Sequence, residues 1–332
     1  MKVGVALPHY DFSFPGRRPA TLDDVVAFAK RVESLGYDSV WMSDHFFLDL
    51  TRYGGPPGRW GSLEALTTLS SIAVETERVR LGTLVLCEAF RHPPVLAKMA
   101  TTLDIVSDGR LDLGMGAGWN EEEYVANGFR FPPVGERIAR LRETIDILAG
   151  MMSNERFSYD GAFYTVDDAP NDPPPVQRPR PPILVGGKGG PKILRIVAEA
   201  ADGWNTVWRW SPDAYAQRLG DLARACERAG RDPSTVTRSI GLYTVVGTDE
   251  ADARRQWDRM AVEGPIDATG MRREELVADA LVGDPAHCVA RIKEFESLGV
   301  GHLVVAFGVV PFSIWDEDQV ELFAREVLPA VR

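Results

Sequence analysis

The sequence predicts a single α/β domain over residues 1–332, a (β/α)8 TIM barrel with insertions. Eight short apolar segments alternate with amphipathic helical segments, which indicates an all-parallel sheet. Glycine, histidine and charged residues follow these apolar segments rather than precede them, as in a barrel whose active site lies at the carboxyl ends of its strands. A chain of 332 residues favours a closed barrel over an open sheet.

The eight predicted strands are short runs rich in β-branched and other apolar residues. They lie at residues 3–7, 39–42, 78–86, the start of 111–124, 183–185, 203–205, 239–246 and 302–307. The helices between them have recognisable ends. Thr21 with Asp24 predicts a cap and Gly36 a stop, while Ser211 and Asp284, each followed by proline, predict two further helix starts.

Three segments are too long for ordinary connections and are interpreted as insertions. Residues 46–61 are rich in glycine, proline and aromatic side chains and predict a functional loop. Residues 154–182 contain FSYDGAFYTV, which predicts a hairpin across Asp160 and Gly161. Residues 249–283 are charged and helical in pattern, and we expect them to lie over the site.

Composition excludes several classes of partner. A net charge of −11 and a pI near 5.1 argue against nucleic acid and anionic membranes, so any anionic ligand must be bound by a local site. The chain has three cysteines and no C-x-x-C motif, and it contains no signal-peptide core or membrane-spanning run. We therefore expect a reduced cytoplasmic protein, and we expect a homodimer.

The stretch LDLGMGAGWNEEEY, residues 111–124, is the most informative part of the chain. Glycines at alternate positions 114, 116 and 118 leave bare backbone at the end of a strand, on which a flat ligand could lie. A tight strand-to-helix turn without a ligand explains the same spacing, and the spacing alone does not choose between them. The three glutamates that follow are typical of a solvated helix start.

Asp44 and His45 follow the second strand. An imidazole that faces a barrel mouth can donate or accept a proton near neutral pH, whereas the alternative is a histidine that only hydrogen-bonds loop backbone. The long aromatic loop beside it favours the catalytic interpretation. Histidines also suggest a metal, but no H-x-H or H-x-x-x-H pair occurs, so no metal site is predicted.

The segment GGKGGPK, from Gly186 to Lys192, joins the fifth strand to a helix. Its glycines free backbone N–H groups, the helix start carries a partial positive charge, and Lys188 adds formal charge. It lacks the terminal G-K-[ST] of a nucleotide-binding P-loop. The segment therefore predicts a site for a cofactor that bears a phosphate.

Together these motifs resemble the luciferase-like monooxygenase superfamily and, within it, the group that uses the deazaflavin coenzyme F420. The resemblance covers nearly the whole chain. It depends on SDHF (43–46), LGTLVL before FRHPP (81–94), LGMGAGWNEEEY (113–124), PPILVGGKGGPK (181–192) and ADGWN (201–205). It implies an oxidoreductase that transfers hydride between the deazaflavin ring and a carbon of a small substrate.

The resemblance also implies roles for individual residues. Asp44 and His45 would lie beside the ring, with His45 on the substrate side. A bulge, often with a non-proline cis peptide bond, would support the ring near Leu84 and Val85. The remaining cofactor-binding residues would be Ala117, Gly118, Asn120, Gly186, Gly187, Lys188, Gly189 and Gly190.

The chain differs from the sugar-phosphate dehydrogenases of this group, which carry a glutamate where this sequence has Trp119. The predicted substrate pocket comprises His9, Trp60, Trp119, Trp204 and Phe307. This pocket favours an apolar or aromatic carbonyl, alkene or alcohol over a sugar phosphate. The alternatives are an FMN-dependent monooxygenase supplied by a separate flavin reductase, a non-catalytic flavin-binding protein and a metal-dependent hydrolase.

Overall fold

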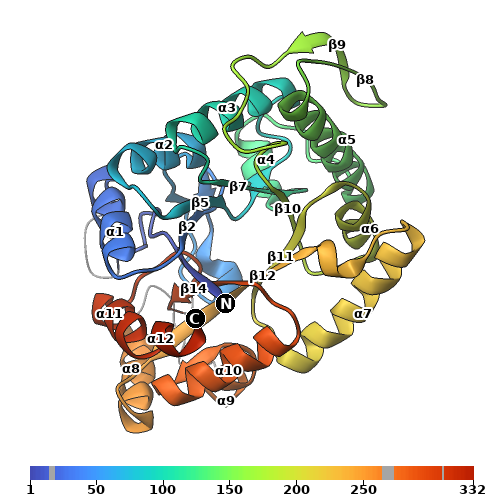
Figure 1. Ribbon diagram of the computed structural model, residues 1–332. Coiled ribbons are helices and arrows are strands. Elements are labelled where there is room, and N and C mark those ends of the chain that lie inside the picture. Colours follow the sequence, from blue (N-terminus) through green and yellow to red (C-terminus); the bar gives the residue numbers. More distant parts are fainter. Residues whose placement is uncertain (15–18, 264–272, 309) are drawn as a thin grey trace.

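The structure of the protein is a computed structural model (Figure 1) that describes residues 1–14, 19–263, 273–308 and 310–332. Within these residues, eight parallel strands close into a barrel, because β10 pairs with β7 as well as with β11. The barrel strands are β1 (Lys2–Ala6), β2 (Ser39–Met42), β5 (Arg80–Thr83), β7 (Leu111–Gly116), β10 (Ile183–Gly186), β11 (Gly203–Trp208), β12 (Thr237–Val246) and β14 (His302–Phe307). The predicted TIM barrel is confirmed.

Helices surround the barrel on its outside (Figure 1). They are α1 (Leu22–Ser34), α2 (Ala65–Glu75), α3 (Pro93–Val106), α5 (Val134–Ser153), α6 (Pro191–Ala200), α7 (Pro212–Arg228), α10 (Pro285–Ser297), α11 (Glu317–Glu326) and α12 (Leu328–Val331), with a 3-10 turn η2 (Pro233–Thr235). The predicted caps are present: Thr21 and Asp24 form a capping box, and Ser211 and Asp284 each accept a hydrogen bond from a first-turn N–H. In the part of the chain that the structure describes, no helix is both long and apolar enough to cross a lipid bilayer.

The three segments that we interpret as insertions have structure of their own. Residues 46–61 form the hairpin β3 (Phe47–Leu48) and β4 (Trp60–Gly61) with η1 (Leu50–Tyr53) between the strands. Residues 154–182 contain the antiparallel hairpin β8 (Arg156–Asp160) and β9 (Thr165–Pro170). Residues 249–283 contain α8 (Glu250–Glu263), α9 (Arg273–Asp279) and β13 (Leu281–Gly283), and their part at 264–272 lies outside the described residues.

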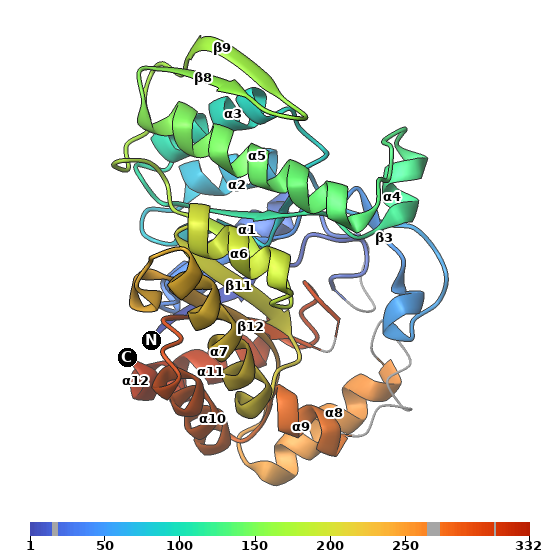
Figure 2. The same ribbon diagram turned by 90° about the vertical axis from the view of Figure 1, so that its right-hand side faces the viewer.

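The two ends of the barrel carry different elements. Both termini lie at one end, whereas β3, α8, α9 and the short helix α4 (Glu121–Ala126) lie towards the other, which is where the strands end (Figure 2). The interior near the strand starts is filled by Trp41, whose Nε1 donates to the Ser39 hydroxyl oxygen at 2.8 Å. A Cβ on Gly82 would lie 2.2 Å from the Trp41 ring. Glycine at this position therefore makes room for the indole that closes the barrel.

Candidate active site

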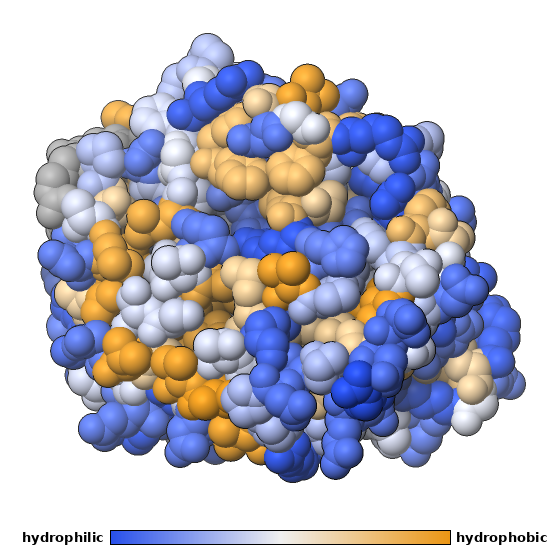
Figure 3. All heavy atoms as spheres, turned by 90° about the horizontal axis from the view of Figure 1, so that it is seen from above, coloured by the Kyte–Doolittle hydropathy of each residue, from blue (hydrophilic) through white to orange (hydrophobic). Residues whose placement is uncertain are grey.

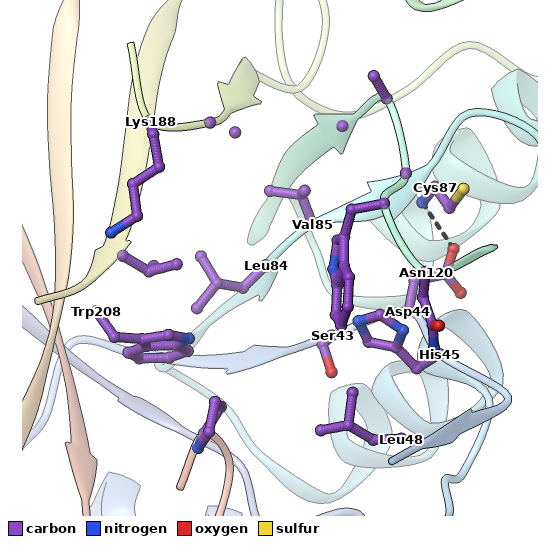
Figure 4. Close-up of a pocket in the computed structure, with 18 of the residues that line it drawn as sticks. Ser43, Asp44, His45, Leu48, Leu84, Val85, Cys87, Asn120, Lys188 and Trp208 are labelled. Carbon is purple, nitrogen blue, oxygen red and sulfur yellow. Dashed lines mark hydrogen bonds between the residues drawn. The ribbon is translucent and has the colours of Figure 1, made fainter. Parts of the chain in front are cut away.

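A cavity of about 940 Å³ opens at the carboxyl ends of the strands (Figure 4). Its lining brings together most of the predicted cofactor residues. These are Asp44, Leu84, Val85, Ala117, Gly118, Asn120, Gly186, Gly187 and Lys188, together with His45 and Trp119. Gly189 and Gly190 do not line the cavity; Gly190 is instead the N-cap of α6. Most of the predicted cofactor residues therefore lie around one cavity.

The floor of the cavity includes the Val85 side chain as well as glycine backbone. The peptide bond between Leu84 and Val85 is cis, at the position where the resemblance places one. A Cβ on Gly116 or Gly186 would lie 2.6 or 2.8 Å from a methyl carbon of Val85, and a Cβ on Gly114 would lie 2.1 Å from the carbonyl oxygen of Thr83. These glycines therefore make room for the segment from Thr83 to Val85, of which Leu84 and Val85 line the cavity beside Gly116 and Gly186.

Asp44 is held by an arginine. Its carboxylate oxygens accept hydrogen bonds from the two terminal guanidinium nitrogens of Arg91 at 2.7 and 2.8 Å, and one oxygen also accepts from the backbone N–H of Cys87 at 2.9 Å. Arg91 also pairs with Glu64. Paired in this two-pronged way and buried, Asp44 is fixed in position, and both of its carboxylate oxygens accept hydrogen bonds within the chain. These bonds tie the end of β2 to Cys87 and Arg91.

His45 faces the cavity and is oriented by Glu123. The Nδ1–H of His45 donates to a carboxylate oxygen of Glu123 at 2.8 Å. The other carboxylate oxygen accepts from the backbone N–H groups of Phe46 and Phe47, and Asn120 donates weakly to the first at 3.3 Å. Because the carboxylate accepts a hydrogen bond from Nδ1–H, a neutral His45 ring carries its one proton on Nδ1 and none on Nε2. The pair therefore presents a proton acceptor within the cavity wall.

Glu123 is a residue of the candidate site that the sequence pattern did not predict. It belongs to a run of three glutamates whose pattern indicated a solvated helix start, and it is buried in the structure. The spacing contained a usable signal, since Glu123 lies three residues after Asn120 and thus on the same helical side as the strand end. What the sequence could not supply was the proximity of α4 to the loop after β2.

His9 does not line the cavity, and this corrects its assignment to the substrate pocket. Its Nδ1–H donates to the carbonyl oxygen of Leu7 at 2.8 Å, so its Nε2 accepts from the Ser43 hydroxyl at 3.0 Å. The hydroxyl of Tyr10 in turn donates to the Ser43 oxygen at 2.7 Å. Burial lowers the pKa of His9 to about 3, so the imidazole stays neutral. His9 supports two lining residues, Tyr10 and Ser43, from behind.

Three further predicted pocket residues also lie away from the lining. Trp204 stacks on Tyr215 of α7 at 5.4 Å between ring centroids, and Phe307 packs against Phe323 of α11 at 5.8 Å. Both side chains point out of the barrel towards the helices, because side chains alternate along a strand. Trp60 packs edge-on against Phe12 at 6.4 Å. Of the five predicted pocket residues, only Trp119 borders the cavity.

Other aromatic residues form the apolar wall instead. Trp208 stacks on Tyr243 with ring centroids 5.6 Å apart and meets Phe312 edge-on at 5.4 Å. Leu48 and Leu276 complete this side of the lining. The sequence predicts a strand at 203–205 only. In the structure β11 continues to Trp208, and the ring of Trp208 therefore lines the cavity.

The cavity ends at the start of α6, where a negatively charged group could be bound. Gly190 caps this helix without a side-chain hydrogen bond, so the first-turn N–H groups keep their partial positive charge. The Lys188 side chain extends from the end of β10 towards Trp208 (Figure 4), and its ammonium lies 4.9 Å from the centre of the Trp210 ring. Burial lowers the pKa of Lys188 below its ordinary value. Within the described residues, no three histidine, cysteine or acidic side chains group as metal ligands.

The family is shown by comparison with known proteins. Residues 1–302 match the family model described as luciferase-like monooxygenase, and the chain belongs to this family. The resemblance inferred from the sequence is therefore confirmed.

Curated relatives match along almost the whole chain. The chain is 30% identical to the F420-dependent glucose-6-phosphate dehydrogenase of Amycolatopsis mediterranei, over 93% of this chain and 94% of the relative. It is also 30% identical to the F420-dependent hydroxymycolic acid dehydrogenase of Mycobacterium tuberculosis, over 99% and 88% of the two chains. Both relatives are dehydrogenases that depend on F420.

Solved structures share the fold at lower sequence identity. An F420-dependent secondary alcohol dehydrogenase in complex with an F420–acetone adduct superposes with a TM-score of 0.78 at 21% identity, covering 100% of this chain and 99% of the other. The monooxygenase RslO1 from Streptomyces bottropensis gives the same TM-score of 0.78 at 24% identity, with both chains covered completely. These likenesses establish the fold, which F420-dependent enzymes and monooxygenases share.

Proposed function

We propose that the protein is an F420-dependent oxidoreductase that interconverts an apolar alcohol and the corresponding carbonyl compound. The observation that supports this proposal is the hydrogen bond of 2.8 Å between His45 Nδ1 and Glu123, since His45 lines a largely apolar cavity and would use its other ring nitrogen for proton transfer. The F420 dependence of both curated relatives supports the choice of cofactor.

The residues present fit this cofactor in size and chemistry. The Val85 floor and the adjacent Leu84 offer an apolar surface for one face of a tricyclic ring. Ala117, Gly118 and Asn120 would border the ring. Gly186 and Gly187, the uncapped start of α6 and Lys188 would hold a phosphate. Bound F420 would supply a hydride acceptor or donor at its ring.

The protein's own residues would then manage the proton. In alcohol oxidation the His45 Nε2 would accept the hydroxyl proton, while the hydride leaves from the carbon of the same alcohol. In carbonyl reduction the imidazolium would return that proton to oxygen. Glu123 would stabilise the charged imidazole and keep the ring in the orientation needed. The surrounding apolar walls would exclude water from the reacting atoms.

The lining favours an apolar substrate. Trp119, Trp208 and Phe312 present ring surface, which would suit an apolar body better than the hydroxyl groups of a sugar. We therefore propose that glucose 6-phosphate, the substrate named for several relatives, is a poor substrate for this chain. Substantial oxidation of glucose 6-phosphate would contradict this part of the proposal.

We also propose a cytoplasmic homodimer whose F420 is reduced or reoxidised by a separate enzyme. Exposed apolar side chains on α2 and α3 support the dimer, namely Val74, Val95, Ile105 and Val106. Figure 3 views the molecule from the side of α3 and shows apolar side chains among the charged ones. Sedimentation of wild type and a Val95→Glu, Ile105→Glu variant would test this, since the variant is expected to be monomeric.

The cofactor is tested by titration. Purified protein is mixed with F420 and, separately, with FMN, and the fluorescence of each cofactor is followed. F420 is expected to bind clearly more tightly than FMN. A preference for FMN, together with product formation that requires O2, would favour the monooxygenase alternative. Binding of F420 without turnover on a panel of alcohols and ketones would favour a non-catalytic binding protein.

A further inference from the structure

We infer that the substrate carries a carboxylate and that the guanidinium of Arg52 binds it. This inference rests on the proposed function, because it specifies which apolar alcohols and ketones the same cavity accepts.

Arg52 is held at the cavity wall by structure on both sides. It lies in η1, which Asp49 caps by accepting the Thr51 N–H at 2.7 Å and which ends at Gly54 in a left-handed conformation. Leu50 of the same turn is fully buried and anchors it. The Arg52 guanidinium carbon lies 4.2 Å from the centre of the Trp119 ring. A side chain stacked in this way has a defined position and a reduced entropic cost of binding.

Arg52 is exposed, and no hydrogen bond joins its guanidinium to another of the described residues. A guanidinium that lies over a ring uses its face, so its N–H donors remain free in its plane. Within the described residues Arg52 forms no ion pair with a carboxylate, although it lines the cavity. The other cavity arginine, Arg209, already donates to both oxygens of Asp279 at 2.9 and 3.1 Å. Arg52 is thus a free cation beside an apolar hollow in a chain of net charge −11.

Arg52 and His45 both contact Trp119, so a carboxylate bound by Arg52 would lie near His45. Trp119, on whose face the guanidinium lies, also meets His45 edge-on with ring centroids 5.6 Å apart. A substrate whose alcohol carbon is near His45 can therefore place a carboxylate on Arg52 while its apolar body contacts Trp208 and Phe312. The planar fork of arginine matches a carboxylate in a two-pronged pair. The substrate class is accordingly an apolar hydroxy acid or keto acid.

The test uses two unreactive probes that share one aromatic body, 2-naphthoate and 2-naphthamide. Their affinities are measured by calorimetry on the full-length protein, first without cofactor and then with F420 bound. Wild type is expected to bind the acid at least about tenfold more tightly than the amide, since a charge-assisted pair replaces a neutral contact. Arg52→Gln is expected to abolish this preference and to leave the amide affinity unchanged, which also shows that the variant is folded.

Arg59→Gln is the matched control. Arg59 belongs to the same insertion and lies over the Phe47 ring at 4.9 Å, but it pairs with Glu122 and does not line the cavity. The preference for the acid is expected to persist in this variant. Equal affinity of acid and amide in wild type, absence of binding by both, or a preference that survives Arg52→Gln would overturn the inference. Failure of F420 to bind would instead contradict the proposed function, because the cofactor-free measurement does not depend on it.

Discussion

His9 and His45 follow neighbouring barrel strands, yet their surroundings give them opposite properties. His9 is fully enclosed, and this burial lowers its pKa to about 3, so the imidazole stays neutral while it donates to a carbonyl and accepts from a hydroxyl. His45 donates to a buried carboxylate and lines the cavity. The difference teaches that burial and the partner of Nδ1 together distinguish two histidines that hold equivalent positions in the fold.

The largest expected effect is that of removing His45. His45→Ala should lower the turnover number about 10²- to 10⁴-fold, the usual contribution of a proton-transfer group, while F420 affinity remains close to that of wild type. Stopped-flow and steady-state absorbance of F420 would measure it. His92→Ala is the control, because His92 precedes α3 without a capping hydrogen bond and lies outside the cavity lining. Full turnover in His45→Ala would remove this residue from the mechanism.

A smaller loss of turnover is expected when Glu123, the partner of His45, is replaced by neutral glutamine. In Glu123→Gln the amide oxygen must continue to accept from the Phe46 N–H, so the amide nitrogen faces His45 Nδ1. That donor forces the proton onto Nε2 and turns the cavity-facing nitrogen into a donor. The turnover number for alcohol oxidation should fall about 10- to 100-fold. Glu122→Gln, which alters an exposed neighbour on the same helix, should retain activity.

For His9 the expected effect is on stability rather than on chemistry. His9→Ala should lower the free energy of unfolding by about 2–4 kcal/mol, because it opens a cavity and leaves the Ser43 hydroxyl without its acceptor. The unfolded chain binds a proton at His9 below about pH 6.5, whereas the folded chain does so only near pH 3, so stability falls as the pH decreases through this window.

Urea unfolding at pH 7 and pH 5 measures this linkage. The loss of stability between the two pH values should be smaller in His9→Ala than in wild type. Some pH-dependent loss of stability should remain in His9→Ala, because burial also lowers the pKa of His302, to about 4. An identical pH dependence in both proteins would show that His9 is not the buried neutral group described above.

Two buried glutamates, Glu123 and Glu88, differ in their hydrogen bonding in the same way as the two histidines differ in their surroundings. Glu123 accepts hydrogen bonds on both oxygens, whereas both oxygens of buried Glu88 have no hydrogen-bond partner among the described residues. Burial raises the pKa of Glu88 to about 7. The folded chain thus binds a proton that the unfolded chain releases above about pH 4.5, so this contribution to stability is lost as the pH rises through 7. Glu88→Gln should raise the free energy of unfolding by about 1–3 kcal/mol at pH 8 and by little at pH 5. An equal gain at both values would contradict it.

Much of the fold could be predicted because it depends on local patterns. Strand runs, capping residues and helix stops identify the eight βα units, and the strand ends then identify most of the cavity lining. The exceptions depended on which way a side chain faces. Trp204 and Phe307 lie on predicted strands but point towards α7 and α11. Glu123 and Arg91 reach the site through contacts between distant segments, with His45 and Asp44 respectively, and no local pattern specifies such contacts.

The packing of Val85 against Gly116 and Gly186 makes these three positions mutually dependent in evolution and in engineering. An alanine at either glycine position alone would collide with a Val85 methyl group, but the same alanine should be tolerated once Val85 is shortened to alanine. Gly114 is different, because its nearest obstacle is the Thr83 carbonyl of the backbone, which no substitution removes. Related chains should therefore exchange residue 85 together with 116 and 186, and should keep glycine at 114 whatever residue 85 becomes.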